Sequence, residues 1–330
     1  MNAAPATVAD QEVIPHRLKN FPIAIFSIVM GMTGLALAWL KAHAVLGMPF
    51  VVAEGLRGSA SVLFVVLLLV YALKALRYPH EILVEMRHPV RINFFATISI
   101  SLLLLATAYV ETHPEVALWL WGVGATLQLL LTLAIFSSWL HHTHYEIHHA
   151  NPAWFIPVVG NILVPVAGVR LASPELSWFF FSIGLVFWVV LLTIVLYRLF
   201  FHEPLPVRLT PTLFILMAPP SVGFIAYLQL DGNHLDAFAR ILYYTALFLA
   251  FLLASNAARF LRTPFFISAW AYSFPLAALT IATLVMNTRL PEPVFATPGL
   301  GLLALVSLVV MMLIVRTLIA IFRGQICVTE

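Results

Sequence analysis

Charged side chains are scarce in this chain. Asp, Glu, Lys and Arg make up only 9% of its 330 residues, whereas apolar residues make up 62%. Soluble proteins carry roughly 25% charged residues, so water cannot be the solvent of most of this surface. Cysteine is also nearly absent, because Cys327 is the single one. This excludes an internal disulfide framework and a thiolate metal cluster.

Long apolar runs recur along the whole sequence, and each is close to the roughly 20 residues that a membrane-spanning helix needs. They predict ten spans at about 21–40, 56–76, 92–111, 115–139, 153–171, 175–200, 210–230, 236–260, 264–287 and 298–322. We therefore expect an all-α integral membrane protein. One transmembrane domain would cover residues 21–323, with short tails at 1–20 and 324–330.

Lysine and arginine are unevenly distributed between alternate loops. If the N-terminus is in the cytoplasm, twelve of the 17 basic residues lie inside, and five lie outside: Lys41, Arg57, Arg170, Arg240 and Arg289. Cytoplasmic loops carry the excess of positive charge in membrane proteins. We therefore expect both termini in the cytoplasm, which requires an even number of spans.

Proline alternates along the predicted spans. The even-numbered spans have none in their interiors, and the odd-numbered ones, except the third, have Pro22, Pro157, Pro165, Pro219, Pro220 and Pro275. Proline kinks a membrane helix and is tolerated where neighbours or a cavity satisfy the freed carbonyl. We interpret the alternation as five helical hairpins, whose odd helices face a central axis and whose even helices face lipid. Gly31 and Gly34 would permit close backbone approach in the first span.

The predicted spans carry no ionisable side chain near their midplanes, since all 14 acidic residues fall in loops, tails or span ends. Carriers and pumps commonly keep such groups inside the bilayer, so a carboxylate proton relay is not expected. No haem-ligating histidine, nucleophile with a base or H-E-x-x-H pattern is visible, and we expect neither an enzyme nor a cofactor. Small hydroxyl groups such as those of Ser27 and Thr97 can solvate an ion weakly, as conduction requires.

Five short motifs are spread along almost the full chain. They are PIAIF at 22–26, HPV at 88–90, WFIP at 154–157, MAP at 217–219 and WAYSF at 270–274. Together they resemble the bacterial tellurite-resistance/dicarboxylate transporter (TehA) family, the relatives of the plant slow anion channels. The resemblance implies a quasi-fivefold arrangement of the hairpins and a pore through the odd helices of each subunit, usually in a homotrimer. Ser27 and Pro275 stand where that family often has glycine.

The resemblance also implies that Phe274 closes the pore as a gate. A large ring across a narrow apolar pore removes water and thereby blocks ions, and the adjacent Pro275 would open the local helix. From the residues alone, Phe274 is one of 25 phenylalanines, and apolar residues at helical spacing usually pack between helices. The further candidates for pore lining or kinks are Phe26, Gly31, Pro157, Pro219 and Pro275.

The expected function is a gated anion channel or uniporter that passes small anions such as chloride or nitrate. The alternatives are a secondary transporter of C4-dicarboxylates such as malate, and an exporter of tellurite or sulfite. The expected partners are these anions, membrane lipid and further copies of the chain in a homotrimer, in the bacterial inner membrane. Nucleic acid is not expected, because the basic residues lie in short loops between apolar runs.

Five histidines and one glutamate gather at residues 141–149, between the fourth and fifth spans. Spacings of three and four would place His141, His144 and His148 on one helical face, where a Zn, Ni or Cu site is feasible. A metal sensor that transports nothing is therefore a further hypothesis. The alternative is a polar interfacial loop, because histidine-rich tracts are only compositional signals.

Overall fold

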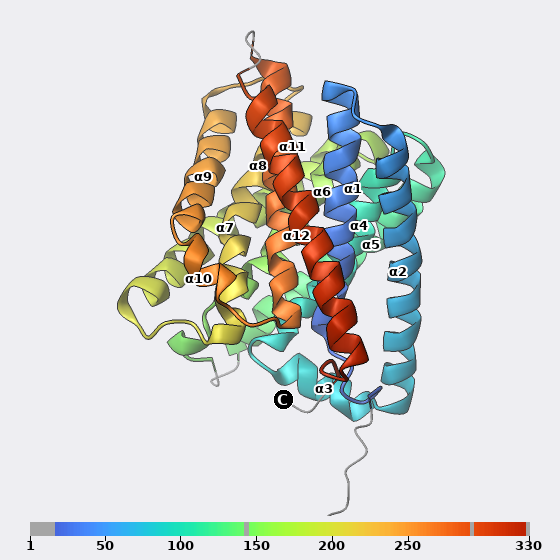
Figure 1. The fold of residues 1–330 in the computed structure, drawn as a ribbon, viewed down its shortest axis with the longest axis vertical. Helices are drawn as coiled ribbons and strands as arrows, with labels where there is room; N and C mark the ends of the chain where they lie inside the picture. Colours follow the sequence, from blue (N-terminus) through green and yellow to red (C-terminus); the bar gives the residue numbers. More distant parts are fainter. Residues whose placement is uncertain (1–16, 142–144, 291–293, 328–330) are drawn as a thin grey trace, which may run out of the picture.

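The computed structural model describes residues 17–141, 145–290 and 294–327. Within these residues, ten helical spans are long and apolar enough to cross a membrane, which confirms the predicted number. Figure 1 shows the spans, coloured in chain order. The odd spans are Ile23–Leu46, Arg91–Tyr109, Pro152–Leu171, Val207–Leu230 and Ile267–Arg289. The even spans are α2 (Phe50–Arg77), α5 (Pro114–His141), α7 (Pro174–Phe201), α9 (Ala237–Ala254) and α12 (Ala296–Phe322).

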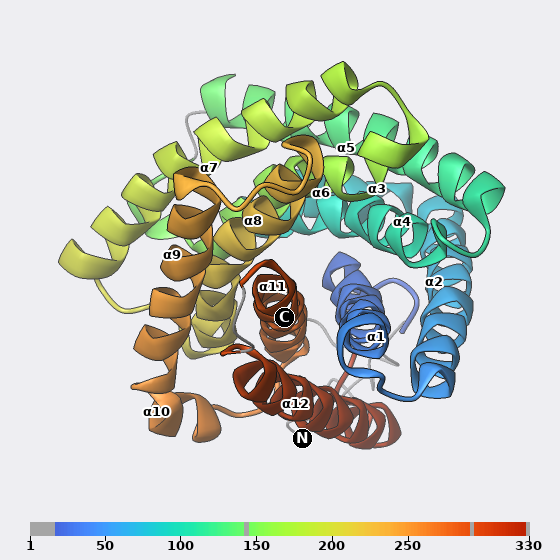
Figure 2. The same cartoon turned by 90° about the horizontal axis from the view of Figure 1, so that it is seen from above.

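The spans form two layers, as the alternation of prolines predicted. In the odd spans 67–83% of the apolar window is buried inside the protein, against 28–33% in the even spans. Figure 2 shows the odd helices at the centre and the even helices around them. We call them the inner and the outer helices. The outer helices expose large apolar side chains such as Leu69, Phe248 and Met311, which fits lipid rather than water as their solvent.

The inner helices close a ring. They are α1 (Ser27–Leu46), α4 (Ala96–Tyr109), α6 (Ile156–Leu171), α8 (Ala218–Leu230) and α11 (Ser273–Arg289). In chain order each contacts the next, and α11 contacts α1. Each also packs against the outer helix of its own hairpin, namely α2, α5, α7, α9 and α12. A single chain therefore encloses a central axis.

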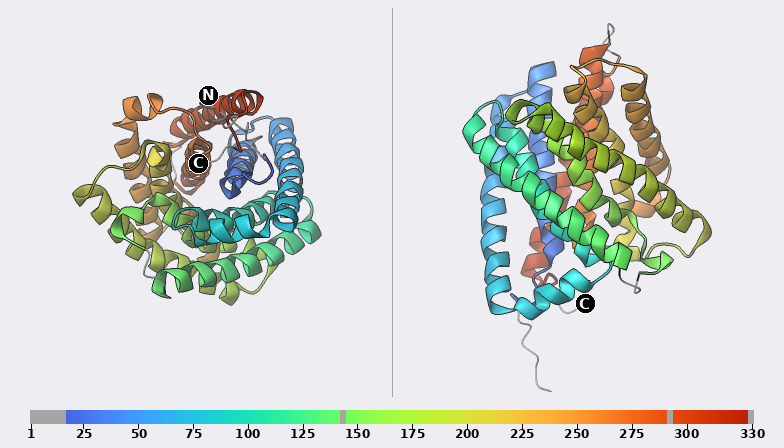
Figure 3. Two further views of the ribbon diagram at one scale, coloured as in Figure 1. Left: turned by 90° about the horizontal axis from the view of Figure 1, so that it is seen from below. Right: turned by 180° about the vertical axis from the view of Figure 1, so that it is seen from behind.

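Every inner span begins as a 3₁₀ helix and then becomes α-helical. The 3₁₀ segments are η1 (Ile23–Phe26), η2 (Arg91–Phe95), η4 (Pro152–Phe155), η5 (Val207–Met217) and η6 (Ile267–Tyr272). They also contact one another in a ring. We call this end of the molecule the start face and the opposite end the end face. The short helix α3 (Pro79–Arg87) lies at the start face (Figure 3).

Most of the prolines lie at junctions between 3₁₀ and α-helical segments, whereas we expected them to kink continuous helices. Pro157, Pro219 and Pro275 each fall in the first turn of an α-helix, directly after a 3₁₀ segment. Proline is tolerated there because the first N–H groups of an α-helix have no partner within it. Pro165 does lie inside α6. The third span has the same 3₁₀ start without a proline, so proline accompanies this junction but does not create it.

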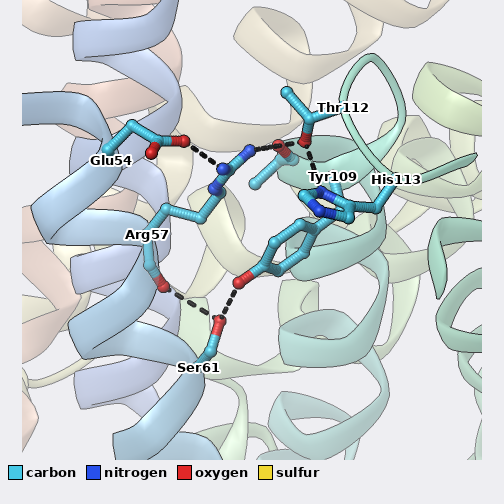
Figure 4. A network of polar contacts seen from close by, with 7 residues as sticks. Glu54, Arg57, Ser61, Tyr109, Thr112 and His113 are labelled. Carbon is cyan, nitrogen blue, oxygen red and sulfur yellow. Dashed lines mark hydrogen bonds and ion pairs between the residues drawn. The ribbon is translucent and has the colours of Figure 1, made fainter. Parts of the chain in front are cut away.

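The second span begins at Phe50, six residues before the expected start at 56, so it includes Glu54 and places Arg57 further inside the helix than expected. Arg57 belongs in the helix because its side chain is buried against α4 rather than exposed to lipid. Its Nη1 donates to the carbonyl oxygen of Ala108 at 3.1 Å and to Thr112 Oγ1 at 2.8 Å, and Nη2 pairs with Glu54 (Figure 4). The guanidinium thus satisfies a carbonyl at the end of α4, where a cation is favoured.

A second buried charged group joins the first hairpin to α3. Lys74 of α2 pairs with Glu85 of α3 at 3.0 Å, and both side chains are less than a tenth exposed. The Lys74 ammonium also donates to the carbonyl oxygen of Phe21 at 2.8 Å, and the Tyr71 hydroxyl donates to Glu85 at 2.7 Å. These bonds tie α2, α3 and the beginning of the first span together at the start face.

Candidate functional site

A cavity lies inside the ring of inner helices, at the level where the 3₁₀ segments become α-helices. Every inner span contributes to its wall, and the space inside, including the part open to solvent, is about 470 Å³. No charged side chain is among the lining residues. They are Ser27, Met30, Phe94, Thr97, Ile156, Val159, Ile215, Ala218, Ser268, Trp270, Ala271, Phe274 and Pro275.

The polar residues of the lining do not offer free hydroxyl protons to the cavity. Ser27 donates to the carbonyl oxygen of Ala24 at 2.6 Å, Thr97 donates to a carbonyl of its own segment, and Ser268 donates to the carbonyl of Arg208. A hydroxyl has one proton, so none of the three can donate to an anion without breaking its backbone bond. The wall is therefore apolar in character and would bind a small ion weakly.

Phe274 lies in the first turn of α11, is 6% exposed and lines the cavity together with Pro275. Its ring packs against the backbone of α1 at Gly34. A Cβ atom placed on Gly34 would lie 3.3 Å from Cδ2 of the Phe274 ring and 3.2 Å from Cβ of Ala277. The absence of a side chain at Gly34 therefore leaves the space that the ring occupies.

Trp270 is the other large aromatic residue of the wall, and it is held differently. Its indole Nε1 donates to Thr317 Oγ1 of α12 at 2.9 Å, which ties the ring to the outer layer. The Phe274 ring has no polar atom, so packing alone fixes its position. Of the two rings, Phe274 is therefore the one that can move without breaking a hydrogen bond.

Phe26 lies outside the lining. It is fully buried, and its ring centroid lies 6.2 Å from that of Phe64 and 5.8 Å from that of Tyr71, both on α2. The side chain therefore faces the outer helix of its own hairpin. Sequence reasoning placed it with the pore candidates because it belongs to the PIAIF motif, but a motif does not give the direction of a side chain.

Gly31 and Pro157 also serve packing between helices. A Cβ on Gly31 would lie 2.2 Å from Ser273 Oγ, so this glycine allows α1 to approach α11. The carbonyl oxygen of Pro157 accepts from Gln128 at 2.7 Å and from Asn161 at 2.8 Å, which joins α6 to α5. These two residues and Pro219 are not among the lining residues.

The histidine-rich segment is only partly described. Helix α5 ends at His141, and His148 lies in the separate 3₁₀ helix Ile147–His149, so the two do not share one helical face as expected. His141 Nδ1 is 2.9 Å from the carbonyl oxygen of Ser137, and His148 Nδ1 is 3.2 Å from a Glu146 carboxylate oxygen. His144 lies outside the described residues, and the metal site stays a prediction.

Comparison with known proteins gives a consistent result along the chain. A family model described as SLAC1, voltage-dependent anion channel, matches residues 20–318. The S-type anion channel SLAH3 of Arabidopsis thaliana is 30% identical over 312 residues, which are 92% of this chain and 49% of the plant protein. The tellurite resistance protein TehA homolog of Haemophilus influenzae is 26% identical over 301 residues, 88% of this chain and 91% of that protein. This chain thus spans about half the length of SLAH3.

Proposed function

The chain belongs to the SLAC1 family of voltage-dependent anion channels, and we propose that it is a gated channel for small monovalent anions such as chloride or nitrate. The observation that carries this proposal is the cavity to which all the inner spans contribute. Because the ring of inner helices closes within one chain, each subunit would hold its own pore.

The chemistry of the wall supports conduction rather than tight binding. An ion that is bound strongly cannot leave, so a conducting pore needs weak, distributed contacts. The apolar wall, with its hydroxyl protons already used by backbone carbonyls, supplies such contacts. The inner spans also point their helical N-termini toward the start face, and the positive ends of their dipoles favour an anion there.

Phe274 is the proposed gate. Its ring lines the cavity at the contact between α1 and α11, and it lies against Gly34. A ring that narrows an apolar passage expels water, and an anion cannot cross a dry passage without losing its hydration. Rotation of this one side chain away from the axis would open the pore and break no hydrogen bond.

The remaining features of the proposal concern the setting of the channel. The start face would be cytoplasmic, because the basic residues concentrate on that side, and the membrane would be the bacterial inner membrane. The channel unit would be residues 21–323, with cytoplasmic tails at 1–20 and 324–330. Three copies would assemble into a homotrimer, which mass measurement of the detergent-solubilised protein tests directly.

Planar bilayer recordings test the proposal. Wild type is compared with Phe274→Ala in chloride, nitrate and malate. The control is Phe224→Ala, because Phe224 is a fully buried phenylalanine of an inner helix that is not part of the lining. We expect small wild-type currents, a large anion-selective increase for Phe274→Ala, and no increase for Phe224→Ala.

Three results would contradict this proposal. If Phe274→Ala passes cations better than chloride, the protein is not an anion channel. If all variants are electrically silent while labelled malate accumulates against a gradient, the protein is a coupled C4-dicarboxylate carrier. Tellurite or sulfite export, suggested by the name of the Haemophilus relative, would show as oxyanion flux without chloride current.

A further inference from the structure

Three basic residues lie at the end face, each near the C-terminal end of a different inner helix. Lys41 belongs to α1, Arg170 to the last turn of α6, and Arg289 is the last residue of α11. Helices α1 and α11 are neighbours in the ring, and α6 lies across from them (Figure 2). Basic residues are rare on this side of the protein, so their concentration around the axis is a specific feature.

Lys41, Arg170 and Arg289 lie at the same end of one closed ring of inner helices. The charges of Arg289 and Arg170 are near enough to act on the ammonium of Lys41. Exposed charges further apart than the Debye length, about 8 Å at physiological ionic strength, are largely screened. The ammonium of Lys41 therefore has two further basic residues near it at this end of the ring.

The three residues differ in what neutralises them. Arg170 pairs with Glu111, and Arg289 Nη2 donates to Asn233 Oδ1 at 2.7 Å. Asp231, which follows α8, lies 3.9 Å from His234. Lys41 has no hydrogen-bond or ion-pair partner among the residues that the structure describes. Its ammonium thus keeps all three of its protons available for a ligand.

We propose that Lys41, Arg170 and Arg289 form a capture site for small inorganic anions at the outer mouth of the pore, in which Lys41 contacts the anion. This inference rests on the proposed channel function and deepens it. The cavity itself has no charged lining residue, so a basic residue at the mouth would add to the preference for anions before they enter. A charged mouth raises the local concentration of the counter-ion and speeds its entry.

The electrical test uses the open background Phe274→Ala, into which Lys41→Gln, Lys41→Glu or Lys41→Arg is introduced. The control is Arg240→Gln, because Arg240 is an exposed cation of the same face on the outer helix α9. The current is measured while chloride is varied at the end face alone. Loss of a charged contact is expected to raise the half-saturating chloride concentration by on the order of tenfold.

The expected order is specific. Lys41→Gln raises the half-saturating chloride concentration, Lys41→Glu raises it further and lowers the anion-to-cation permeability ratio, and Lys41→Arg stays near the background value. These effects shrink when chloride is saturating. If Lys41→Gln matches Arg240→Gln while the background passes anions, the capture site is wrong and the channel function stands. If the background itself passes no anions, the channel function fails.

A binding measurement tests the site independently of any current. Chloride or nitrate that binds the folded protein raises its apparent melting temperature in detergent as concentration increases. We expect this anion-dependent rise in wild type and Lys41→Arg, and a clearly smaller one in Lys41→Gln. Equal rises in wild type and Lys41→Gln would overturn the site, whether or not the protein conducts.

Discussion

Substitution of Gly31 by alanine tests how tightly α1 and α11 are packed beside the cavity. A Cβ at this position would lie 2.2 Å from Ser273 Oγ, 2.8 Å from Ser273 Cβ and 2.8 Å from Cε3 of Trp270. Ordinary van der Waals contact begins near 3.4 Å, so the closest pair overlaps by about 1.2 Å. Rotation of the hydroxyl does not remove the clash, because Cβ of Ser273 is also too close.

The magnitude follows from two opposing effects. Overpacking of this kind costs roughly 1–3 kcal/mol, and loss of the Ser273 hydrogen bond to the Trp270 carbonyl adds about 1 kcal/mol. Alanine in place of glycine returns up to about 1 kcal/mol through helix propensity. We therefore expect Gly31→Ala to lower the free energy of unfolding by about 1–3 kcal/mol. Trp270 cannot move aside easily, since its indole is bonded to Thr317.

The assay is reversible chemical unfolding in detergent micelles, followed by tryptophan fluorescence. Gly122→Ala is the matched control, because Gly122 lies in the outer helix α5 and a Cβ atom added there would have nothing within 4 Å. The control should be unchanged or slightly stabilised. The double variant Gly31→Ala/Ser273→Gly should recover part of the loss. If Gly31→Ala is as stable as the control, the close approach of α1 and α11 described above is wrong.

Two further predictions concern charged groups at the membrane faces. Lys74→Met leaves the buried carboxylate of Glu85 without its counter-ion and should lower the free energy of unfolding by about 3–5 kcal/mol. The double variant Lys74→Met/Glu85→Gln should recover most of this loss. Equal losses in the single and double variants would refute the pairing. The pKa of Asp236 is held below its usual value, first because its carboxylate accepts from the backbone N–H of Ala239 and second because it accepts from the Tyr227 hydroxyl. A lowered pKa in the folded state contributes stability above the unfolded pKa of about 3.9 that is lost as pH falls. Asp236→Ala should therefore lower the melting temperature at pH 7, and its difference from wild type should narrow at and below pH 4; a difference that is independent of pH would contradict this role.

The sequence was sufficient to predict the number of spans and their sorting into two layers. Both depend on apolar length and on proline position, which are local properties of the chain. The 3₁₀ start of every inner span was not predicted. The third span forms this start without a proline, so no single residue type marks it in the sequence. It arises where five segments converge on one axis, which is a tertiary property.

The direction of side chains and the burial of charged residues also could not be predicted from the sequence. Phe26 and Phe274 both belong to family motifs, yet one faces α2 and the other the cavity, and only the packed helices distinguish them. Arg57 and Lys74 looked like ordinary basic residues at span ends, but they are 6% and 1% exposed. Arg57 also bonds to Ala108 and Thr112, and Lys74 bonds to Phe21 and Glu85, all of them on other segments of the chain, so no local pattern could reveal this burial.

The most direct test of the central claim is a graded series at one position. Single-channel conductance and open probability are recorded for wild type, Phe274→Leu, Phe274→Val and Phe274→Ala, with reversal potentials in chloride gradients. If the ring occludes an anion-selective pore, current rises stepwise as the side chain becomes smaller while the preference for anions is unchanged. Currents that do not depend on side-chain size, or a selectivity that changes along the series, would contradict the account.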